Sequence, residues 1–465
     1  MSPTGTPESP LRVAVIGAGP AGFYAIERLF KEKNLAIEAD LYDRLPTPYG
    51  LVRAGVAPDH QKIKSVTKVF DKLAAQPQFH FFGNVTIGQD VQVDDLRRFY
   101  HAIIYTTGAQ TDKNLDIPGI DLQNSHAATE FVAWYNGHPD YRDCQFDLSQ
   151  ERVAVVGIGN VAVDVARILC RTPEELMETD IAEHALEALR HSRVKEVYML
   201  GRRGVAQAAF TTAEVKELGE MAGAHVTVPP AEAELDPVSQ ESLAEADRGT
   251  MRKIEIVQEY AGRPCTGKPR CLTIRFLVSP VELIGDADGR VCAMRLVHNE
   301  LYKTESGSIR SRATDRFEEI PVGLVFRSIG YEGVPIPGVP FHERWSVILN
   351  EMGRVIDPQT NQPVLGEYTA GWIKRGPSGV IGTNKPDAIE TVECLLADVQ
   401  AGKMLAPEMP TFTAVQSFIQ ERQPRYVTYE DWLRLNELEE ANGAACGRPR
   451  LKFTRVEEML AALGK

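Results

Sequence analysis

Two glycine-rich segments, each directly after an apolar run, constrain the fold of this chain most strongly. Residues 17–22 (GAGPAG) follow the apolar residues 13–16, and residues 157–162 (GIGNVA) follow the apolar residues 153–156. A glycine-rich turn between a strand and a helix lets the backbone approach a pyrophosphate group at the helix N-terminus. Two such turns, 140 residues apart, predict an α/β fold with two dinucleotide-binding, Rossmann-like domains. Electron transfer between two bound dinucleotides is the expected use of such a pair.

The composition excludes several other classes of protein. A chain of 465 residues is long enough for two or three domains, and it contains no apolar stretch that could insert into a membrane. The net charge of −13 argues against nucleic acid as the main partner. The seven cysteines include no CxxC pair, which argues against a disulfide framework, a zinc ribbon or an iron–sulfur cluster. We interpret all seven as reduced thiols of a cytoplasmic protein.

The apolar pattern and the glycine and proline residues predict how the two domains are organised. The expected strands and helices of the first are 12–16, 21–33, 36–42 and 103–109, and those of the second are 160–171 and 196–200. Helix-start signals also occur at 172–175 and 180–183. The acidic residues 231–247 predict an irregular surface excursion, and the glycine- and proline-rich residues 330–340 predict a return to the first domain.

The residues that follow the second strand of each unit indicate which dinucleotide is bound. Asp43 stands 21 residues beyond the last glycine of the first motif, where an acid bonds a ribose hydroxyl, as in FAD or NAD sites. The corresponding place in the second unit has Gly201, Arg202 and Arg203. Guanidinium groups pair well with a phosphate dianion, so this site favours the 2′-phosphate of NADPH.

Several segments resemble the adrenodoxin-reductase-like family of ferredoxin–NADP reductases, which are flavoproteins of the glutathione-reductase type. The resemblance extends from about residue 11 to residue 460 and rests on residues 15–24, 45–53, 56–60, 159–164, 201–204, 371–377 and 379–384. It implies an NADP-binding domain, residues 112–335, inserted into a discontinuous FAD-binding domain of residues 1–111 and 336–465.

The same resemblance implies the site residues. The FAD contacts would be Gly17, Ala18, Gly19, Gly22, Asp43, Leu51, Val85, Trp372, Gly379, Val380 and Ile381. The NADP(H) contacts would be Ile158, Gly159, Asn160, Val161, Arg202, Arg203, Glu214 and Gly379. His60 and Glu217 resemble a catalytic pair near the nicotinamide that could relay a proton or hold the ring. Glu214 also fits a capping box that begins at Thr211, and no metal site is expected.

The resemblance implies an NADPH–ferredoxin oxidoreductase, in which FAD receives a hydride from NADPH and single electrons pass to a ferredoxin-type iron–sulfur protein. The alternatives are a flavin-dependent NADPH monooxygenase and a redox-sensing FAD/NADP-binding protein without turnover. A disulfide reductase would need a redox cysteine pair beside the flavin. We expect a monomer or a weak homo-oligomer.

An acidic chain needs a locally basic face to bind an acidic ferredoxin. The candidate clusters in the sequence are Arg248, Arg252 and Lys253, and Lys268 with Arg270.

Overall fold

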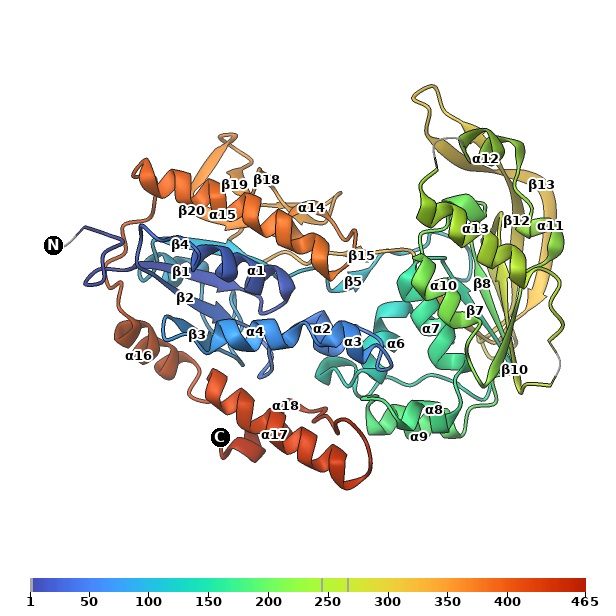
Figure 1. Cartoon of the computed structure of the whole chain (residues 1–465), viewed down its shortest axis with the longest axis horizontal. Helices are drawn as coiled ribbons and strands as arrows, with labels where there is room; N and C mark the ends of the chain where they lie inside the picture. Colours follow the sequence, from blue (N-terminus) through green and yellow to red (C-terminus); the bar gives the residue numbers. More distant parts are fainter. Residues whose placement is uncertain (1–2, 244–245, 266) are drawn as a thin grey trace. The chain divides into compact units, whose positions relative to one another are not determined.

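The chain forms two compact units, each with its own parallel sheet (Figure 1). The computed structural model describes residues 3–243, 246–265 and 267–465. Unit 1 contains the described residues up to Val56, His60–Thr111 and Tyr331–Lys465, and unit 2 contains Ala57–Asp59 and Asp112–Gly330. The chain therefore leaves unit 1 after Thr111 and returns to it at Tyr331, whereas the sequence places the return at residue 336.

Two short strands mark the two crossings of the chain. These are β5 (Thr111–Asp112) and β15 (Tyr331–Glu332), which pair in a two-stranded sheet. The backbone N–H of Gln110 donates to the carbonyl of Glu332 at 2.9 Å. The ends of the inserted segment are thus adjacent.

Unit 1 contains a seven-stranded sheet in the order β18-β19-β20-β4-β1-β2-β3. The strands β20, β4, β1, β2 and β3 run parallel, and β18 and β19 add an antiparallel edge. Every residue of β1 is buried, as expected for a parallel strand covered on both faces. β4 pairs with β1, so the strand expected near residue 103 is part of the central sheet.

The strands of unit 1 are β1 (Leu11–Ile16), β2 (Ile37–Tyr42), β3 (Phe79–Phe82), β4 (Ala102–Tyr105), β16 (Phe341–His342), β17 (Val347–Ile348), β18 (Asn350–Glu351), β19 (Arg354–Asp357) and β20 (Gln362–Thr369). Its helices are α1 (Pro20–Leu29), α2 (Leu51–Ala54), α3 (Gln61–Lys64), α4 (Thr67–Ala74), α5 (Val93–Arg97), α14 (Trp372–Arg375), α15 (Asn384–Gln400), α16 (Phe412–Arg422), α17 (Tyr429–Ala445) and α18 (Val456–Leu463). Helices α1 and α15 pack side by side on the sheet (Figure 1).

Unit 2 contains a six-stranded parallel sheet in the order β6-β14-β7-β8-β10-β9 and a separate antiparallel sheet, β11-β12-β13. Its strands are β6 (Ser125–Ala127), β7 (Arg152–Val156), β8 (Glu196–Leu200), β9 (Ala224–Thr227), β10 (Arg270–Arg275), β11 (Val278–Gly285), β12 (Val291–Lys303), β13 (Ile309–Pro321) and β14 (Leu324–Arg327). Its helices are α6 (Ala128–Tyr135), α7 (Asn160–Cys170), α8 (Pro173–Met177), α9 (Glu183–Arg190), α10 (Thr212–Leu218), α11 (Pro230–Ala233), α12 (Pro237–Ser242) and α13 (Arg248–Tyr260).

The two parallel sheets confirm the predicted α/β fold class, but two local expectations were wrong. Helix α9 begins at Glu183, and its N-cap residue is Ala182 rather than Asp180. Residues 231–247 are not irregular throughout, because prolines at the first helical positions start α11 and α12 there. Residues 244 and 245 lie outside the described residues. The helix start at Thr172 is confirmed as a capping box with Glu175.

The expectation that all seven cysteines are reduced was also wrong. Cys265 and Cys271 form a disulfide, with their Cα atoms 5.6 Å apart. The chain turns back between them, so six positions of separation allow a bond that no CxxC spacing signals. No described helix is long and apolar enough to cross a membrane.

Candidate functional site

The first glycine-rich turn connects β1 to α1 and uses its glycines for two different purposes. Gly17 has φ +110°, and a Cβ atom there would lie 2.7 Å from the carbonyl oxygen of Thr106. A Cβ at Gly22 would collide with the carbonyl oxygen of Gly17. A Cβ at Gly19 would meet no atom within 4 Å. Gly17 and Gly22 are therefore required by the fold, whereas Gly19 leaves open space at the N-terminus of α1.

Asp43 lies directly after β2 and holds the first glycine-rich turn. One carboxylate oxygen accepts the backbone N–H of Ala18 at 2.9 Å, and the other accepts the N–H of Leu45 at 2.9 Å. Burial raises the pKa of the Asp43 carboxyl, and the two backbone N–H donors oppose this shift. The structure thus places Asp43 beside the open space at Gly19, where the acid expected for a ribose should be.

Two other predicted contacts lie on the loops next to the same turn. Leu51 begins α2 and is 37% exposed. Val85 is buried, and its backbone N–H donates to the carbonyl of Asp43 at 2.9 Å. Tyr49, just before α2, donates its backbone N–H to the carbonyl of Ala18 at 2.7 Å. The loop before α2 is therefore attached directly to the glycine-rich turn.

The segment from Trp372 to Ile381 approaches the N-terminus of α15. Trp372 is half-buried, donates its indole N–H to the carbonyl of Ser378 at 3.1 Å and packs against the ring of Tyr331. Gly379 has φ +79°, and Val380 is 52% exposed. Gly379 is exposed, so its backbone is accessible to a ligand, and a Cβ atom there would collide with the side chain of Thr383.

The second glycine-rich turn connects β7 to α7 and repeats this arrangement in unit 2. Gly157 has φ +136°, and a Cβ there would collide with the carbonyl oxygen of Ser328. A Cβ at Gly159 would meet no atom within 4 Å. The carbonyl of Ile158 accepts the N–H of Phe210 at 3.0 Å, and Val161 packs on the core of unit 2. Gly159 therefore leaves open space at the N-terminus of α7.

Two arginines follow β8 beside this second turn. A Cβ at Gly201 would touch the side chain of Ile158, so the two loops are in contact. Among the described residues, neither Arg202 nor Arg203 forms an ion pair. Burial lowers the pKa of Arg203, and the neighbouring guanidinium of Arg202 lowers it further. Two cations without an ion-pair partner among the described residues, at the carboxyl end of a parallel strand, have the chemistry that an anion needs.

The side chain of Asn160, at the start of α7, binds protein rather than solvent. Its carbonyl oxygen accepts the backbone N–H of Thr211 at 2.9 Å, which fixes the start of α10. Thr211 in turn accepts the N–H of Glu214, so Thr211 caps α10. The carboxylate of Glu214 points elsewhere, to Arg167. The capping box that the sequence also allowed is therefore not closed by Glu214, because the N–H of Thr211 binds Asn160 instead.

Arg167, in the last turn of α7, organises a group of carboxylates and could not be assigned from the sequence. Its guanidinium is fully buried and donates to Asp59 at 2.8 Å, Asp164 at 2.8 Å, Glu214 at 3.0 Å and Glu217 at 3.3 Å. Although burial opposes it, the charges of Asp164 and Asp59 raise the pKa of Arg167. The only sequence signal is an arginine on the apolar face of a predicted helix.

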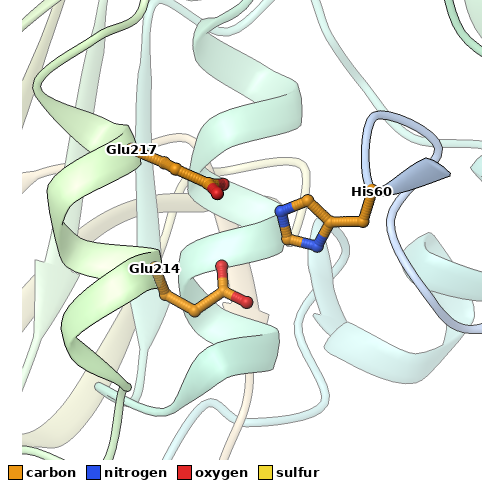
Figure 2. Close-up of side chains that lie close together, drawn as sticks. All are labelled: His60, Glu214 and Glu217. Atoms are coloured by element: carbon orange, nitrogen blue, oxygen red, sulfur yellow. The ribbon is translucent and has the colours of Figure 1, made fainter. Parts of the chain in front are cut away.

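Figure 2 shows the predicted pair His60 and Glu217 together with Glu214. His60 follows directly on Asp59, which belongs to unit 2 and is bound by Arg167. Glu214 and Glu217 both lie on α10 of unit 2, whereas His60 itself belongs to unit 1. The pairing of His60 with Glu217 therefore joins the two units and stays a prediction.

The carboxylates of Glu214 and Glu217 could in principle offer oxygen ligands to a metal ion. However, Arg167 already donates an N–H group to each of the two glutamates. A cation would have to compete with this fixed positive charge. The contacts within unit 2 therefore favour two hydrogen-bonded carboxylates over a metal centre.

The basic clusters expected to bind a partner are mostly engaged within unit 2. Lys253 is buried and donates to a backbone carbonyl at 2.6 Å, and Lys268 does the same at 2.6 Å. Arg270 donates to backbone carbonyls, and Arg252 pairs with a glutamate at 2.7 Å. Of the five predicted cations only Arg248 forms no such bond within the described residues. These contacts reduce the free charge that the two clusters present, and their role in partner docking stays a prediction.

Comparison with known proteins identifies the family. Residues 11–218 match the model of the pyridine nucleotide-disulphide oxidoreductase family. The chain is 44% identical to NADPH-ferredoxin reductase FprA of Mycobacterium tuberculosis over 460 residues, which cover 97% of this chain and 98% of FprA. It is 40% identical to human mitochondrial NADPH:adrenodoxin oxidoreductase over 473 residues, covering 99% and 93% of the two chains. The chain belongs to the FprA and adrenodoxin reductase family.

The structures of this family agree with the fold described above. The structure of M. tuberculosis FprA in complex with NADPH superposes with a TM-score of 0.90 at 44% identity and covers 98% of this chain and 100% of FprA. The two parallel Rossmann-like sheets are therefore those of FprA. The family resemblance stated from the sequence motifs is confirmed over the full length.

Proposed function

We propose that this chain is an NADPH–ferredoxin reductase, with FAD held by unit 1 and NADP(H) held by unit 2. One observation carries the proposal. In each unit a Cβ at the middle glycine of the turn, Gly19 or Gly159, would meet no protein atom within 4 Å. Both glycines lie directly before a helix that follows a parallel strand, which is where a pyrophosphate binds. This open space suits a ligand, because the fold itself does not require these two glycines.

Unit 1 fits FAD. The turn at Gly19 and the N-terminus of α1 would hold the pyrophosphate, and Asp43 lies where an acid bonds an unphosphorylated ribose. The backbone from Gly379 to Ile381 would approach the flavin ring at the start of α15. Leu51, Val85 and Trp372 would complete the contacts that the resemblance implies.

Unit 2 fits NADP(H). The turn around Gly159 would hold the pyrophosphate, and Arg202 and Arg203 would bind the 2′-phosphate that distinguishes NADPH from NADH. Two guanidinium groups without a carboxylate partner among the described residues favour a dianion at this place. Ile158, Asn160, Val161 and Glu214 would line the rest of the site.

His60 and Glu217 are assigned as the residues that orient the reacting nicotinamide. The carboxylate of Glu217 accepts an N–H of Arg167 at 3.3 Å, so its position is fixed. In the role that the resemblance implies, the imidazole of His60 would relay a proton or hold the nicotinamide ring, and Glu217 would be its carboxylate partner.

When bound, FAD would accept a hydride from NADPH and return the two electrons one at a time to a ferredoxin-type protein. The disulfide of this chain does not suit a disulfide reductase. Cys271 pairs in register with Glu196, at the opposite end of β8 from Arg202. The disulfide thus lies at the amino end of the parallel strands, whereas the second glycine-rich turn lies at their carboxyl end.

The purified protein should be yellow and should reduce a ferredoxin with NADPH, with cytochrome c as the final acceptor. Stable binding of FAD without electron transfer to any ferredoxin would favour the redox-sensor alternative. A long-lived flavin–oxygen adduct in stopped-flow spectra would favour the monooxygenase. Cell fractionation tests the expected cytoplasmic location, and sedimentation tests the expected monomer or weak oligomer.

We predict that His60→Gln and Glu217→Gln slow flavin reduction by NADPH, because each removes one member of the orienting pair. A positioned acid–base group typically contributes about 10²-fold or more to a rate. Anaerobic single-turnover absorbance at the flavin band measures the rate, and the FAD content serves as the control. Unchanged rates in both variants would return His60 and Glu217 to a structural role.

A further inference from the structure

Arg375, the last residue of α14, binds both ends of the turn formed by residues 378–383, which lies between α14 and α15. One terminal nitrogen of its guanidinium donates to the carbonyl and to the hydroxyl of Ser378, both at 2.8 Å. The other terminal nitrogen donates to the hydroxyl of Thr383 at 3.3 Å and to the side-chain carbonyl of Asn384 at 3.1 Å. A single guanidinium group therefore spans the turn.

Two further carbonyl groups of the turn depend on residues that Arg375 binds. The hydroxyl of Thr383, which accepts from Arg375, donates to the carbonyl of Val380 at 2.6 Å. The side-chain amide of Asn384, whose oxygen also accepts from Arg375, donates to the carbonyl of Ile381 at 3.2 Å. Arg375 thus acts on each of these two carbonyl groups through one intervening side chain.

The backbone N–H groups of the same turn are left for a ligand. Among the described residues, the N–H groups of Gly379, Val380 and Ile381 donate to no protein atom. Gly379 has φ +79°, and both Gly379 and Val380 are exposed. Unpaired backbone N–H groups in one turn suit the acceptor atoms of a ligand. The turn therefore offers donors, while its carbonyl groups are bound to the protein.

The two helices that flank the turn are themselves held together. Lys374 on α14 is buried and forms an ion pair with Asp387 on α15 at 3.1 Å. Asp387 also accepts the backbone N–H of Gly371, directly before α14, at 2.5 Å. Because α14 is only four residues long, these contacts rather than its own stability hold it in place. A shift of the turn would therefore have to break the contacts of Arg375.

We propose that Arg375 is a positioning residue for FAD. Its forked guanidinium shapes the turn so that the N–H groups of Gly379, Val380 and Ile381 meet acceptor atoms of the flavin ring. This inference rests on the proposed function and adds a residue that is not among the site residues implied by the resemblance. Arg375 acts through the backbone of the turn, so it does not itself need to touch the cofactor.

The test is Arg375→Lys, which keeps the positive charge but lacks the two forked ends that reach Ser378 and Thr383. The FAD-free protein is titrated with FAD, and binding is followed by the fluorescence of the flavin. We expect the Kd for FAD to rise about tenfold or more, because the N–H groups of the turn no longer lie where the flavin accepts them. An unchanged Kd would overturn the proposal.

The midpoint potential of the bound FAD separates positioning from a merely structural role. Reduced FAD carries more negative charge than oxidised FAD, so its binding depends more on the N–H donors. Arg375→Lys should weaken the binding of reduced FAD about tenfold more than that of oxidised FAD, which corresponds to a two-electron midpoint potential about 30 mV lower. Spectroelectrochemical titration measures this shift. An unchanged potential with a lower melting temperature would make Arg375 merely structural and overturn the proposal.

Two further variants separate geometry from charge and from general effects on α15. Arg375→Met removes the charge as well, and we expect it to impair FAD binding about as much as Arg375→Lys does. A defect confined to Arg375→Met would show that the charge acts rather than the fork, and would overturn the proposal. The matched control is Arg354→Lys, because Arg354 also binds α15, through Asp398 at 2.7 and 3.0 Å. The control should change the Kd for FAD less than about twofold, and an equal effect would overturn the proposal.

The same titrations distinguish this inference from the proposed function. A wild-type protein that binds no FAD would contradict the proposed function itself. If the wild-type protein binds FAD and Arg375→Lys weakens only the binding of NADP⁺, the proposed function stands, but the role of Arg375 towards FAD is overturned.

Discussion

At the scale of single residues, the two middle glycines are the most informative positions because the protein alone does not require them. Gly19 has φ −86° and Gly159 has φ −100°, values that any residue adopts. In contrast, Gly17 and Gly157 have positive φ, and a Cβ atom at either position would collide with a backbone carbonyl group. A substitution at Gly19 or Gly159 therefore tests ligand binding with little effect on the fold.

We predict that Gly19→Val weakens FAD binding and that Gly159→Val weakens NADP(H) binding, each by about tenfold or more and without loss of folding. A side chain in either open space would occupy the volume of a pyrophosphate, and overpacking of this kind costs about 1–3 kcal/mol. Absorbance at the flavin band measures the first effect, and titration with NADP⁺ measures the second. Each variant is the control for the other. Full flavin occupancy in Gly19→Val would contradict the assignment of unit 1.

Coenzyme preference also belongs to single residues. The variant R202A/R203A should raise the KM for NADPH far more than the KM for NADH, because only NADPH carries the 2′-phosphate. A charge-assisted hydrogen bond contributes about 1.5–3 kcal/mol, which corresponds to about 10- to 150-fold for each arginine. Steady-state kinetics with ferricyanide and both coenzymes measures the ratio. Equal effects on the two coenzymes would place the 2′-phosphate elsewhere.

At the scale of elements, α17 fixes the short helix α2 through one buried carboxylate. Glu439 is fully buried and accepts hydrogen bonds from Arg53 on α2 at 2.8 Å, from Arg450 at 2.8 Å and from the backbone N–H of Phe453 at 2.9 Å. Although burial opposes it, the charges of Arg53 and Arg450 lower the pKa of Glu439. A helix of four residues has little stability of its own, so this contact from the C-terminal region holds it.

We predict that Glu439→Gln lowers the free energy of unfolding of the FAD-free protein by about 3 kcal/mol, because it removes a buried charge that neutralises two partly buried guanidinium groups. A lowered pKa means that the wild-type carboxylate stabilises the fold above pH 4.5 and that this contribution is lost as the pH falls below that value. The variant should therefore show a weaker decline of stability in acid. Urea unfolding at several pH values measures both effects, and identical curves would contradict them.

The elements also show what the sequence could and could not predict. Strands such as β1 and β7 were predictable, because a buried parallel strand is a short apolar run bounded by turn residues. The helices α2 and α3 were not, because they are one turn long and depend on tertiary contacts. The residues of the candidate site also fall into those that the sequence could predict and those that it could not. The glycine turns and Arg202–Arg203 follow local spacing, whereas Arg167 joins partners 108 and 50 positions away.

At the scale of the whole molecule, the chain consists of one compact unit inserted into another. Each unit has its own buried core: the residues packed around α7 belong only to unit 2, and those around α1 belong only to unit 1. The two ends of the insertion meet where β5 and β15 pair, and the N–H of Lys113 donates to the carbonyl of Gly330 at 2.9 Å. Insertions with adjacent ends disturb the host least.

This arrangement predicts that residues 112–330 can be replaced by a Gly-Gly linker with retention of FAD binding. The glycine-rich turn, Asp43 and the loop from Gly379 to Ile381 all stay in the remaining chain, and Thr111 and Tyr331 are already close. The variant should be yellow and cooperative in thermal unfolding, but it should not oxidise NADPH, since Arg202 and Arg203 are removed. The excised segment, expressed alone, should bind an immobilised 2′,5′-ADP ligand. Its control is the same segment with R202A/R203A. A soluble linker variant without flavin would show that unit 1 needs the inserted unit to form its FAD site.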